Sequence, residues 1–448
     1  MDEKLSVFWG KDLVGTLRRM PEPRQLTFRY DGGWLASGGP PVSLSLPLSE
    51  ADQEPLATTN FFGNYIPEGY AYVALTLLRH IPHGDTFRFL SRYGRECAGA
   101  LSVLPYGDPV MESPADYRDV TDELTRQLSL PPERRANLTA VTGAKISLAG
   151  AQNKLAAVLE GERILVPADA SFASTTHIIK SPAGGFADLQ YNEAFCMELA
   201  RAVDLPVAKS DIVNIGGSDV LVVERYDRTV LGSTVYRLHQ EDFCQATGIS
   251  SVNKYEEFGG PGFSACAGLI EGCIGKNRSA DDFAKLAVFN FIIGNCDAHA
   301  KNFSLLYERV PELDLQGTGM RLAPFYDLLS TLAYTDLGID TSMAMRYGDI
   351  HTHEAIGSSS FAALASDLGM EISRFTGLAR ETTAAVAEAA SEIADKHGRR
   401  FPETGIYGKL QAIIENGTAS ANMALDGLGE IPKPNPVKPR PSESEPRR

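Results

Sequence analysis

The stretch Gly294-Asn295-Cys296-Asp297-Ala298-His299-Ala300-Lys301-Asn302-Phe303, here called the Asp297 loop, is the most informative part of this sequence. It follows residues 281–294, whose apolar side chains recur at helical spacing, and it precedes the apolar run 303–307. Asp297 and Asn302 lie five residues apart on this loop. Phosphoryl transfer needs a carboxylate beside the attacking hydroxyl and an amide oxygen that helps to hold Mg²⁺. The spacing therefore favours a phosphotransferase over other chemistries.

A second acid completes this interpretation, because Mg²⁺ takes hard oxygen ligands that usually come from more than one loop. Asp327, in Ala323-Pro324-Phe325-Tyr326-Asp327-Leu328-Leu329, follows another apolar approach and is the candidate. His299 admits two further roles, metal ligand and general base. The metal role is disfavoured because no second histidine lies at i+4 and no H-E-x-x-H pattern is present. An Asp and an Asn at this spacing also occur on ordinary solvated loops. The functional interpretation therefore depends as well on the predicted helix and strand on either side of the loop and on Asp327.

A fixed cation for the nucleotide phosphates is predicted at Lys180, which ends the apolar strand Thr176-His177-Ile178-Ile179-Lys180. The helix predicted over residues 192–203 carries Glu193 and Glu198, either of which can pair with Lys180 and orient it. Glu193 is preferred. The alternatives are a merely solvated lysine and an acid that stabilises the first turn of its own helix.

A loop of small residues, Ser147-Leu148-Ala149-Gly150-Ala151-Gln152-Asn153-Lys154, suits close approach of the backbone to phosphates. We call it the small-residue loop. It matches neither G-x-x-x-x-G-K-[ST] nor G-x-G-x-x-G-x-V. Typical P-loop NTPases and typical protein kinases are therefore poor matches, and taken alone the loop reads equally well as a simple turn.

The composition excludes several classes of protein. The chain has 448 residues, enough for two or three domains at roughly 150 residues each. With 42 Lys and Arg against 57 Asp and Glu, the net charge of −15 disfavours direct binding to nucleic acid. No apolar run approaches the length of a membrane span and no signal peptide is evident, so a cytoplasmic protein is expected. The six dispersed cysteines predict buried thiols and no disulfide framework or zinc site.

The remaining pattern predicts short strands near the N-terminus, more strands in the middle and helices toward the C-terminus. Residues 106–135 resemble a surface connector, and the alanine-rich helix predicted over 371–396 is expected to end at Gly398. The proline-rich tail, residues 431–448, is expected to be disordered. The other predicted elements are strands at 5–9, 26–30, 94–104, 154–159, 177–180 and 220–225 and a helix at 70–80.

Read in order, several motifs together resemble the HipA family, the serine/threonine kinases that act as toxins of bacterial type II toxin–antitoxin pairs. Beside the small-residue loop, the Lys180 strand and the Asp297 loop, the resemblance rests on Val223-Glu224-Arg225-Tyr226-Asp227-Arg228, Arg237-Leu238-His239-Gln240-Glu241-Asp242-Phe243 and Phe325-Tyr326-Asp327. Phe61-Phe62-Gly63-Asn64-Tyr65-Ile66-Pro67-Glu68-Gly69 and residues 94–105 resemble the small domain that precedes the kinase lobes. The likeness extends over residues 1–420.

The resemblance implies an α+β fold that is bilobal and protein-kinase-like, with a small β-rich N-terminal domain and a helix-rich C-terminal lobe. It implies four segments: an N-terminal domain at 1–108, an N-lobe at 109–235, a helical C-lobe at 236–430 and the tail at 431–448.

The resemblance also assigns roles within a site for ATP and Mg²⁺. Asp297 would be the catalytic base or hydroxyl-orienting acid, and Asn302 and Asp327 would be Mg²⁺ ligands. Lys180 would clamp the phosphates with Glu193 as its partner, and Ser147 matches the family's autophosphorylation serine. The other residues implied to contact ATP are Ala149, Gly150, Ala151, Gln152, Asn153, Lys154, the adenine hinge Glu224, Arg225 and Tyr226, and His299, Ala300, Lys301, Tyr326 and Leu328.

The resemblance implies partners as well. A HipB-like helix-turn-helix antitoxin would bind this chain at a surface outside its active cleft, so contact with operator DNA would be indirect. No membrane would be involved. The acceptor would be a protein of the translation machinery, such as an aminoacyl-tRNA synthetase. Phosphorylation of Ser147 would switch the kinase off, because a phosphate adds nearly two negative charges beside bound ATP.

Two other functions stay open at the level of sequence. Asp297 and His299 form Asp-x-His-x-x-Asn with Asn302, where protein kinases usually carry lysine in place of the histidine. That pattern is similar to small-molecule phosphotransferases, so Asp297 predicts phosphoryl transfer better than it predicts the acceptor. The second alternative is a catalytically silent module that acts as a transcriptional co-repressor.

Overall fold

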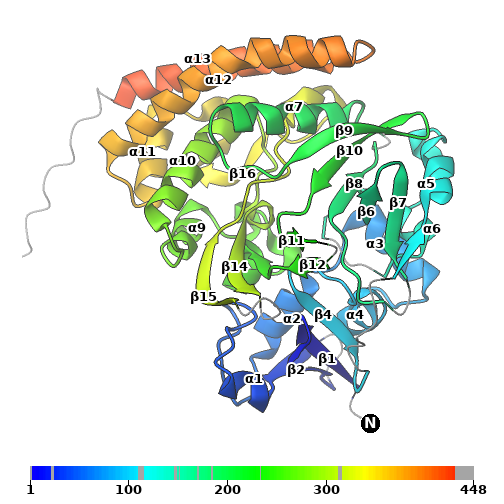
Figure 1. The fold of residues 1–448 in the computed structure, drawn as a ribbon. Coiled ribbons are helices and arrows are strands. Elements are labelled where there is room, and N and C mark those ends of the chain that lie inside the picture. Colours follow the sequence, from blue (N-terminus) through cyan, green and yellow to red (C-terminus); the bar gives the residue numbers. More distant parts are fainter. Residues whose placement is uncertain are drawn as a thin grey trace, which may run out of the picture.

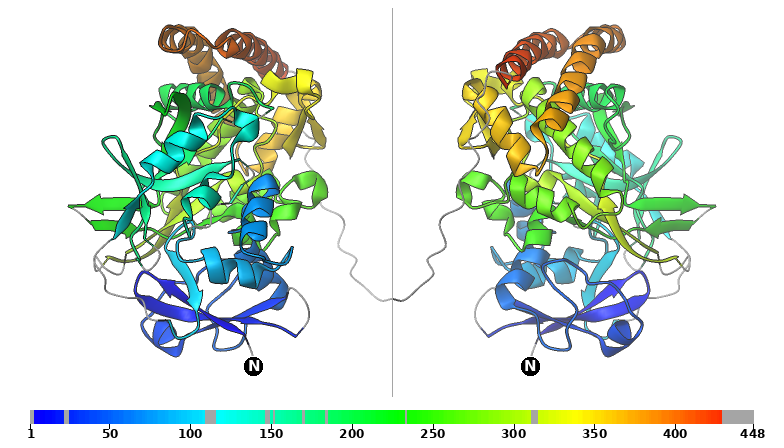
Figure 2. Two further views of the ribbon diagram at one scale, coloured as in Figure 1. Left: turned by 90° about the vertical axis from the view of Figure 1, so that its right-hand side faces the viewer. Right: turned by 90° about the vertical axis from the view of Figure 1, so that its left-hand side faces the viewer.

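The computed structural model describes residues 3–21, 25–108, 116–145, 149–150, 152–168, 171–182, 185–232, 234–310 and 315–428. The N-terminal part, drawn in blue, lies at one end of the molecule, and the two longest helices lie at the opposite end (Figures 1 and 2). The predicted tail, 431–448, falls outside the described residues, as do Ser147 and Ala151.

The N-terminal part is an antiparallel sheet of order β3-β2-β1-β4 with helices packed against it. Buried aromatic side chains, among them Trp9, Phe28 and Phe62, fill the space between sheet and helices. The strands expected at 5–9 and 26–30 are confirmed. Of the strand expected at 94–104, only the last part is extended. The elements are β1 (Lys4–Trp9), β2 (Asp12–Arg19), β3 (Leu26–Tyr30), α1 (Gly32–Ala36), α2 (Pro55–Gly63), α3 (Gly69–Leu78), α4 (Thr86–Tyr93) and β4 (Leu101–Pro105).

The middle of the chain forms a six-stranded sheet of order β5-β7-β6-β8-β10-β9. Its antiparallel register pairs Lys154 on one strand with Lys180 on the next, which brings the two predicted phosphate-binding lysines side by side. The elements are β5 (Tyr117–Asp119), α5 (Thr121–Leu128), α6 (Leu138–Thr142), β6 (Lys154–Glu160), β7 (Arg163–Pro167), β8 (His177–Lys180), α7 (Leu189–Ala202), β9 (Ser210–Ile215) and β10 (Ser218–Glu224).

The prediction that residues 106–135 are a surface connector is wrong for part of the segment. Part of it, β5, is an edge strand of this sheet, and α5 buries Leu124 and Leu128 against the sheet. The helix α5 is short and amphipathic, and its apolar side chains are too few to stand out as a period in the sequence.

The C-terminal part is mostly helical and carries the Asp297 loop between α10 and β14, as the sequence predicts. The helices are α8 (Phe243–Thr247), α9 (Phe263–Ile270), α10 (Lys276–Ile293), α11 (Ser358–Asp367), α12 (Ile372–Arg400) and α13 (Ile406–Gly427). The strands are β11 (Arg228–Leu231), β12 (Thr234–Arg237), β13 (Gln240–Asp242), β14 (Ser304–Val310), β15 (Leu315–Leu322), β16 (Ser342–Tyr347) and β17 (Ile350–Thr352). Short 3₁₀ turns include η2 (Ser251–Asn253), η3 (Glu256–Phe258) and η4 (Ala300–Asn302).

Helix α12 corrects one expected boundary. Gly398 does not end the helix, which continues to Arg400. Ile393 and His397 are buried in the last turns, and α12 packs along α7, α10 and α13. Packing of these turns outweighs the roughly 1 kcal/mol by which an interior glycine disfavours a helix.

Two expectations about composition can be compared with the structure. All six cysteines are buried and free, so the prediction of buried thiols is confirmed. Within the described ranges, no helix is both long and apolar enough to cross a bilayer.

Candidate functional site

A cleft of about 1120 Å³ lies where the N-terminal part, the six-stranded sheet and the Asp297 loop meet. Most of the residues that the sequence singles out line it, although they come from segments far apart in the chain. They include Gly150, Gln152, Asn153, Lys154, Lys180, Glu193, Glu224, Tyr226, Asp297, His299, Asn302, Tyr326 and Asp327. Ala300 and Leu328 are buried and do not line the cleft.

The Asp297 loop is held by contacts of its own backbone and side chains. Helix α10 ends at Gly294, whose φ of 64° is left-handed and turns the chain into the loop. The Asn302 side chain donates a hydrogen bond from Nδ2 to the carbonyl of Asp297, over 3.3 Å. Lys301 is buried, and its ammonium donates to Oδ1 of Asn64 (2.7 Å) and to Asp242 (3.2 Å). The charge of Lys301 therefore anchors the loop to the N-terminal part.

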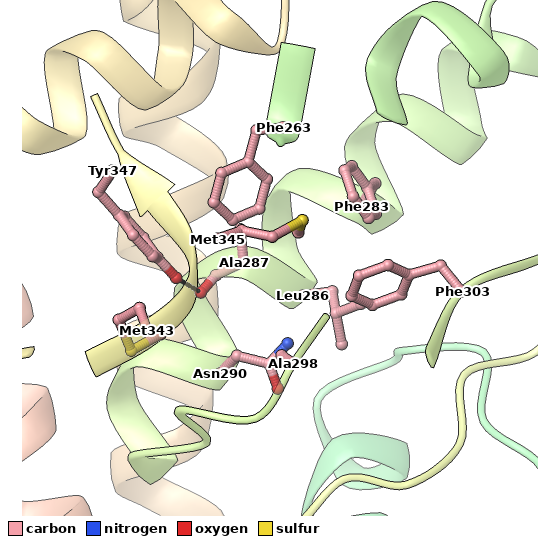
Figure 3. Close-up of a pocket in the computed structure, with 10 residues that line it drawn as sticks. All are labelled: Phe263, Phe283, Leu286, Ala287, Asn290, Ala298, Phe303, Met343, Met345 and Tyr347. Carbon is pink, nitrogen blue, oxygen red and sulfur yellow. Dashed lines mark hydrogen bonds between the residues drawn. The ribbon is translucent and has the colours of Figure 1, made fainter. Parts of the chain in front are cut away.

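Beneath the loop lies a much smaller cavity of about 10 Å³ (Figure 3). Ala298 and Phe303 of the loop line it together with aromatic and methionine side chains of α9, α10 and β16. The Tyr347 hydroxyl donates to the carbonyl of Ala287 across 2.7 Å. A space of this size holds at most about one water molecule. It is a packing gap in the core under the loop.

Lys180 lies at the centre of a charged cluster in the cleft. Its Nζ is 2.6 Å from Oε1 of Glu193 on α7, and it also pairs with Asp327. Burial opposes the charge of Lys180, but the two carboxylates outweigh burial and raise its pKa. Glu193 is thus the partner that the sequence favoured. Glu198, the alternative, instead pairs with Lys396 and His397.

Asp327 reaches the cluster from a strained backbone position. Its φ of 56° is left-handed, which only a few per cent of non-glycine residues adopt. The segment before it is fixed by a hydrogen bond from the amide of Ala208 to the carbonyl of Phe325, at 2.9 Å. Burial alone would raise the pKa of Asp327, but Lys180 and Lys154 outweigh burial and lower it, so its carboxylate is charged. A strained residue that aims a charged side chain into a cleft is typical of a functional position.

The small-residue loop is attached to the N-terminal part. Gly150 has a φ of 100°, and its carbonyl accepts a hydrogen bond from the amide of Glu68 over 3.0 Å. L side chains rarely adopt this φ, so the position favours glycine, and a Cβ there would also displace the flexible ammonium of Lys154, which would lie 2.7 Å away. The Asn153 side chain bonds the backbone of Leu138 and Ala136 and is structural.

The three hinge residues, Glu224, Arg225 and Tyr226, make different contacts through their backbone and side chains. The amides of Glu224 and Arg225 donate to the carbonyls of Lys209 and Thr176, so both are already used within the protein. The ring of Tyr226 stacks on that of Tyr326, with centroids 5.6 Å apart.

The guanidinium of Arg225 lies in a buried ionic network. It is 3.1 Å from Glu96 of the N-terminal part and 2.9 Å from Asp227. Arg228 contacts the same two acids, at 2.9 Å and 3.0 Å. This network joins the N-terminal part to the hinge, and local sequence patterns give no sign of it.

His299 is buried, and burial lowers its pKa to about 3, which keeps the imidazole neutral near pH 7. Among the described residues, no group of three or more His, Cys, Asp and Glu side chains is arranged to hold a metal ion by itself. The metal-ligand role for His299 therefore gains no support.

Two cleft residues escape sequence reasoning altogether. The Tyr255 hydroxyl donates to Oδ1 of Asp297 at 2.8 Å, and Lys254 pairs with Glu68 at 2.7 Å. Tyr255 is 42 residues from Asp297. No local spacing signals such a contact.

The fold, together with a lysine–glutamate pair facing an aspartate loop across a cleft, defines a protein of the protein-kinase-like class. Family models extend this conclusion. The HipA-like C-terminal domain matches residues 146–396, and the HipA N-terminal domain matches residues 5–104. The chain belongs to the HipA family.

Relatives with names agree with this assignment. The chain is 36% identical to "Putative kinase Y4mE" of Sinorhizobium fredii, over 87% of this chain and 93% of that protein. It is 29% identical to the serine/threonine-protein kinase toxin HipA of Shewanella oneidensis, over 86% and 88% of the two chains. The solved Shewanella oneidensis complex of HipA, HipB and operator DNA matches with a TM-score of 0.80 at 24% identity, covering 96% of this chain and 100% of that one. This last likeness supports the bilobal fold.

Proposed function

We propose that this chain is an ATP- and Mg²⁺-dependent serine/threonine kinase that transfers the γ-phosphate of ATP to a hydroxyl of a protein acceptor. The single observation that carries the proposal is the cluster of Lys180, Glu193 and Asp327 in the same cleft as Asp297. A fixed cation for the phosphates, a charged acid for the metal and a carboxylate for the acceptor are the parts that phosphoryl transfer requires. The membership of the HipA family and the kinase names of its relatives support the same activity.

Each part has a role in this proposal. Lys180 and Lys154 lie side by side on β8 and β6, where they would neutralise the phosphates. Gly150 and its neighbours would bring backbone amides close to the phosphates. Asp297, which is open to the cleft, would orient the acceptor hydroxyl and accept its proton. The rings of Tyr226 and Tyr326 and the backbone of the hinge would border the adenine.

The donor set of the cleft fits Mg²⁺. Asn302 keeps its amide oxygen free of the hydrogen bond that its Nδ2 makes, and Asp327 carries a charged carboxylate. Both are hard oxygen ligands, and Mg²⁺ bound to phosphates takes only one or two such groups from the protein and fills its other positions with water. Asn302 and Asp327 would therefore hold the ion, which would neutralise charge that develops on the phosphates.

The regulation and partners of the HipA type belong to the proposal as well. Ser147 lies outside the described residues, just before Gly150, and its phosphorylation would add negative charge beside bound ATP. The solved relative is a complex with HipB and operator DNA, which supports a HipB-like antitoxin as partner. The net charge of −15 agrees with DNA contact through that antitoxin. A protein of the translation machinery is the proposed acceptor.

Mass spectrometry of the purified chain with and without MgATP tests the proposal. We expect a mass increase of one phosphate that depends on MgATP and maps to the peptide containing Ser147. If the protein stays unphosphorylated but consumes ATP when a metabolite is added, a small-molecule kinase would be favoured instead. If the protein neither gains phosphate nor binds ATP in a Mg²⁺-dependent way, the alternative of a catalytically silent co-repressor would be favoured.

The affinity for ATP is expected to fall as the pH rises through 8. Burial lowers the pKa of Lys154 to about 8, so its protonated fraction drops from about 0.9 at pH 7 to about 0.1 at pH 9. Lys154 carries the positive charge that attracts the phosphates only when it is protonated. ATP should therefore bind about tenfold more weakly at pH 9. Equilibrium titration of MgATP at both pH values measures this.

The control for this prediction is Lys154→Arg, since a guanidinium stays charged across the whole range. The variant should show little change in affinity between pH 7 and pH 9. An equal fall in the variant would mean that another group causes the pH dependence.

A further inference from the structure

Tyr255 is the side chain that contacts the carboxylate of Asp297 among the described residues. It lies between η2 and η3, and its hydroxyl donates to Oδ1 of Asp297 across 2.8 Å. Its ring also packs against the imidazole of His299 in a T-shaped arrangement, with centroids 5.4 Å apart and planes at 82°. These two contacts fix Tyr255 onto the Asp297 loop from a segment that belongs to neither neighbouring element of that loop.

The segment that carries Tyr255 is itself held by the N-terminal part. Lys254 pairs with the carboxylate of Glu68 at 2.7 Å, and both groups are largely shielded from water. The amide of Glu68 donates to the carbonyl of Gly150. One residue of the N-terminal part thus touches both the small-residue loop and the segment that holds Asp297. Tyr255 is placed by a connection that spans the whole cleft.

We propose that Tyr255 is a positioning residue for phosphoryl transfer, whose hydroxyl holds Oδ1 of Asp297 so that Oδ2 faces the acceptor hydroxyl. This inference rests on the proposed kinase function. A carboxylate has two oxygens and rotates freely about its last torsion unless one oxygen is held. Fixing that torsion keeps the second oxygen within reach of the acceptor, and misplacement of a reacting group by about 1 Å costs rate steeply.

The phenol suits this role because it keeps its proton. Burial and the neighbouring charge of Asp297 raise the pKa of Tyr255, so the hydroxyl is a neutral donor at all pH values near 7. In the transfer, the acceptor oxygen bonds to the γ-phosphorus while the bond to the bridging oxygen of ADP breaks. The acceptor proton passes to Oδ2 of Asp297 and ADP leaves. Tyr255 neither gains nor loses a proton.

The opposite role is also testable. If the Tyr255 hydroxyl occupied the place of the acceptor hydroxyl, it would compete with the acceptor and slow the reaction. Asp297 is exposed to the cleft even with Tyr255 bound, so the contact leaves space beside the carboxylate. The observations therefore favour positioning over blocking.

The test is Tyr255→Phe, which keeps the ring against His299 and removes the hydroxyl. The initial rate of phosphate incorporation into the full chain is measured over a range of MgATP concentrations. We expect the maximal rate to fall about tenfold, the effect of losing one hydrogen bond to a charged group, while half-saturation by ATP stays within twofold. Thermal melting confirms that the variant is folded.

Tyr106→Phe is the matched control, since Tyr106 is 61% exposed and does not line the cleft. It should behave as the wild type. An unchanged or increased maximal rate in Tyr255→Phe would overturn the positioning role, and so would a loss seen only as weaker ATP binding. Absence of incorporation in the wild type would overturn the proposed kinase function and this inference with it.

Discussion

Replacing Asp297 by asparagine is expected to reduce phosphoryl transfer by about 10³-fold and to leave ATP binding intact. The proposed role of Asp297 is to orient the acceptor hydroxyl and accept its proton, a contribution worth about 10²–10⁴-fold in rate. Asparagine has the same size but cannot take the proton. The Tyr255 hydroxyl can still donate to the side-chain oxygen that remains, so the loop should keep its shape. The loss is therefore expected in the rate of transfer alone.

Incorporation of labelled phosphate from MgATP measures the effect, and an ATP titration with thermal melting shows that the variant still binds and folds. Asp336→Asn is a suitable control because Asp336 is exposed and forms a surface ion pair with Lys409. It should retain full activity. Transfer by Asp297→Asn within tenfold of the wild type would contradict the assignment of Asp297. Wild-type protein that neither transfers phosphate nor binds ATP in the presence of Mg²⁺ would instead favour the co-repressor.

Sequence reasoning succeeds here where function is encoded over short spans. The place of the Asp297 loop between a helix and a strand could be predicted, because helical spacing of apolar residues precedes the loop and an apolar run follows it. Asp297 and Asn302 share this loop because they are only five residues apart. The pairing of Lys180 with Glu193 is also within reach of local reasoning, since the end of β8 and the first half of the following helix α7 are close in the chain. Asp327 required a guess about a separate loop, and it does line the same cleft.

The remaining parts of the cleft depend on contacts between distant segments. Glu68 meets Lys254 across 186 residues, and Tyr255 meets Asp297 across 42 residues. Nothing in either local pattern distinguishes these side chains from ordinary surface polar residues. Tertiary packing also overrides local signals, as at Gly398 inside α12. The N-terminal part therefore reads as a separate small domain in the sequence, although its side chains reach into the cleft.

The second large effect concerns stability. Glu96→Gln is expected to lower the free energy of unfolding by about 3–5 kcal/mol, the typical result of removing one partner from a buried ionic network. Glu96 is 3% exposed, and its Oε1 accepts hydrogen bonds from Arg225, Arg228 and the hydroxyl and amide of Thr175. Glutamine keeps the shape but removes the charge. Among the described residues, the two buried guanidinium groups would then share Asp227 as their one acid within ion-pair distance.

Urea unfolding of the full chain measures this loss, with Glu381→Gln as the control. Glu381 is mostly exposed in its pair with Lys285, and breaking such a surface pair changes stability by at most about 1 kcal/mol. Equal stabilities of the two variants would show that the Glu96 network contributes no more than a surface pair. Weaker ATP binding is also expected in Glu96→Gln, because Arg225 belongs to the hinge and Arg228 lies two residues after it.

The pH dependence of the same variant separates the charge of Glu96 from its shape. Burial alone would raise the pKa of Glu96, but Arg225, Arg228 and Arg237 outweigh burial and lower it. A carboxyl whose pKa is lower in the folded state stabilises the fold above its unfolded pKa of about 4.3, and this stabilisation is lost as the pH falls. The wild type should therefore lose stability below pH 4 more steeply than Glu96→Gln does. If the stabilities of the two proteins fell in parallel with pH, Glu96 would act through its hydrogen bonds and shape. A charge that titrates would make the stability of the wild type alone depend on the protonation of Glu96.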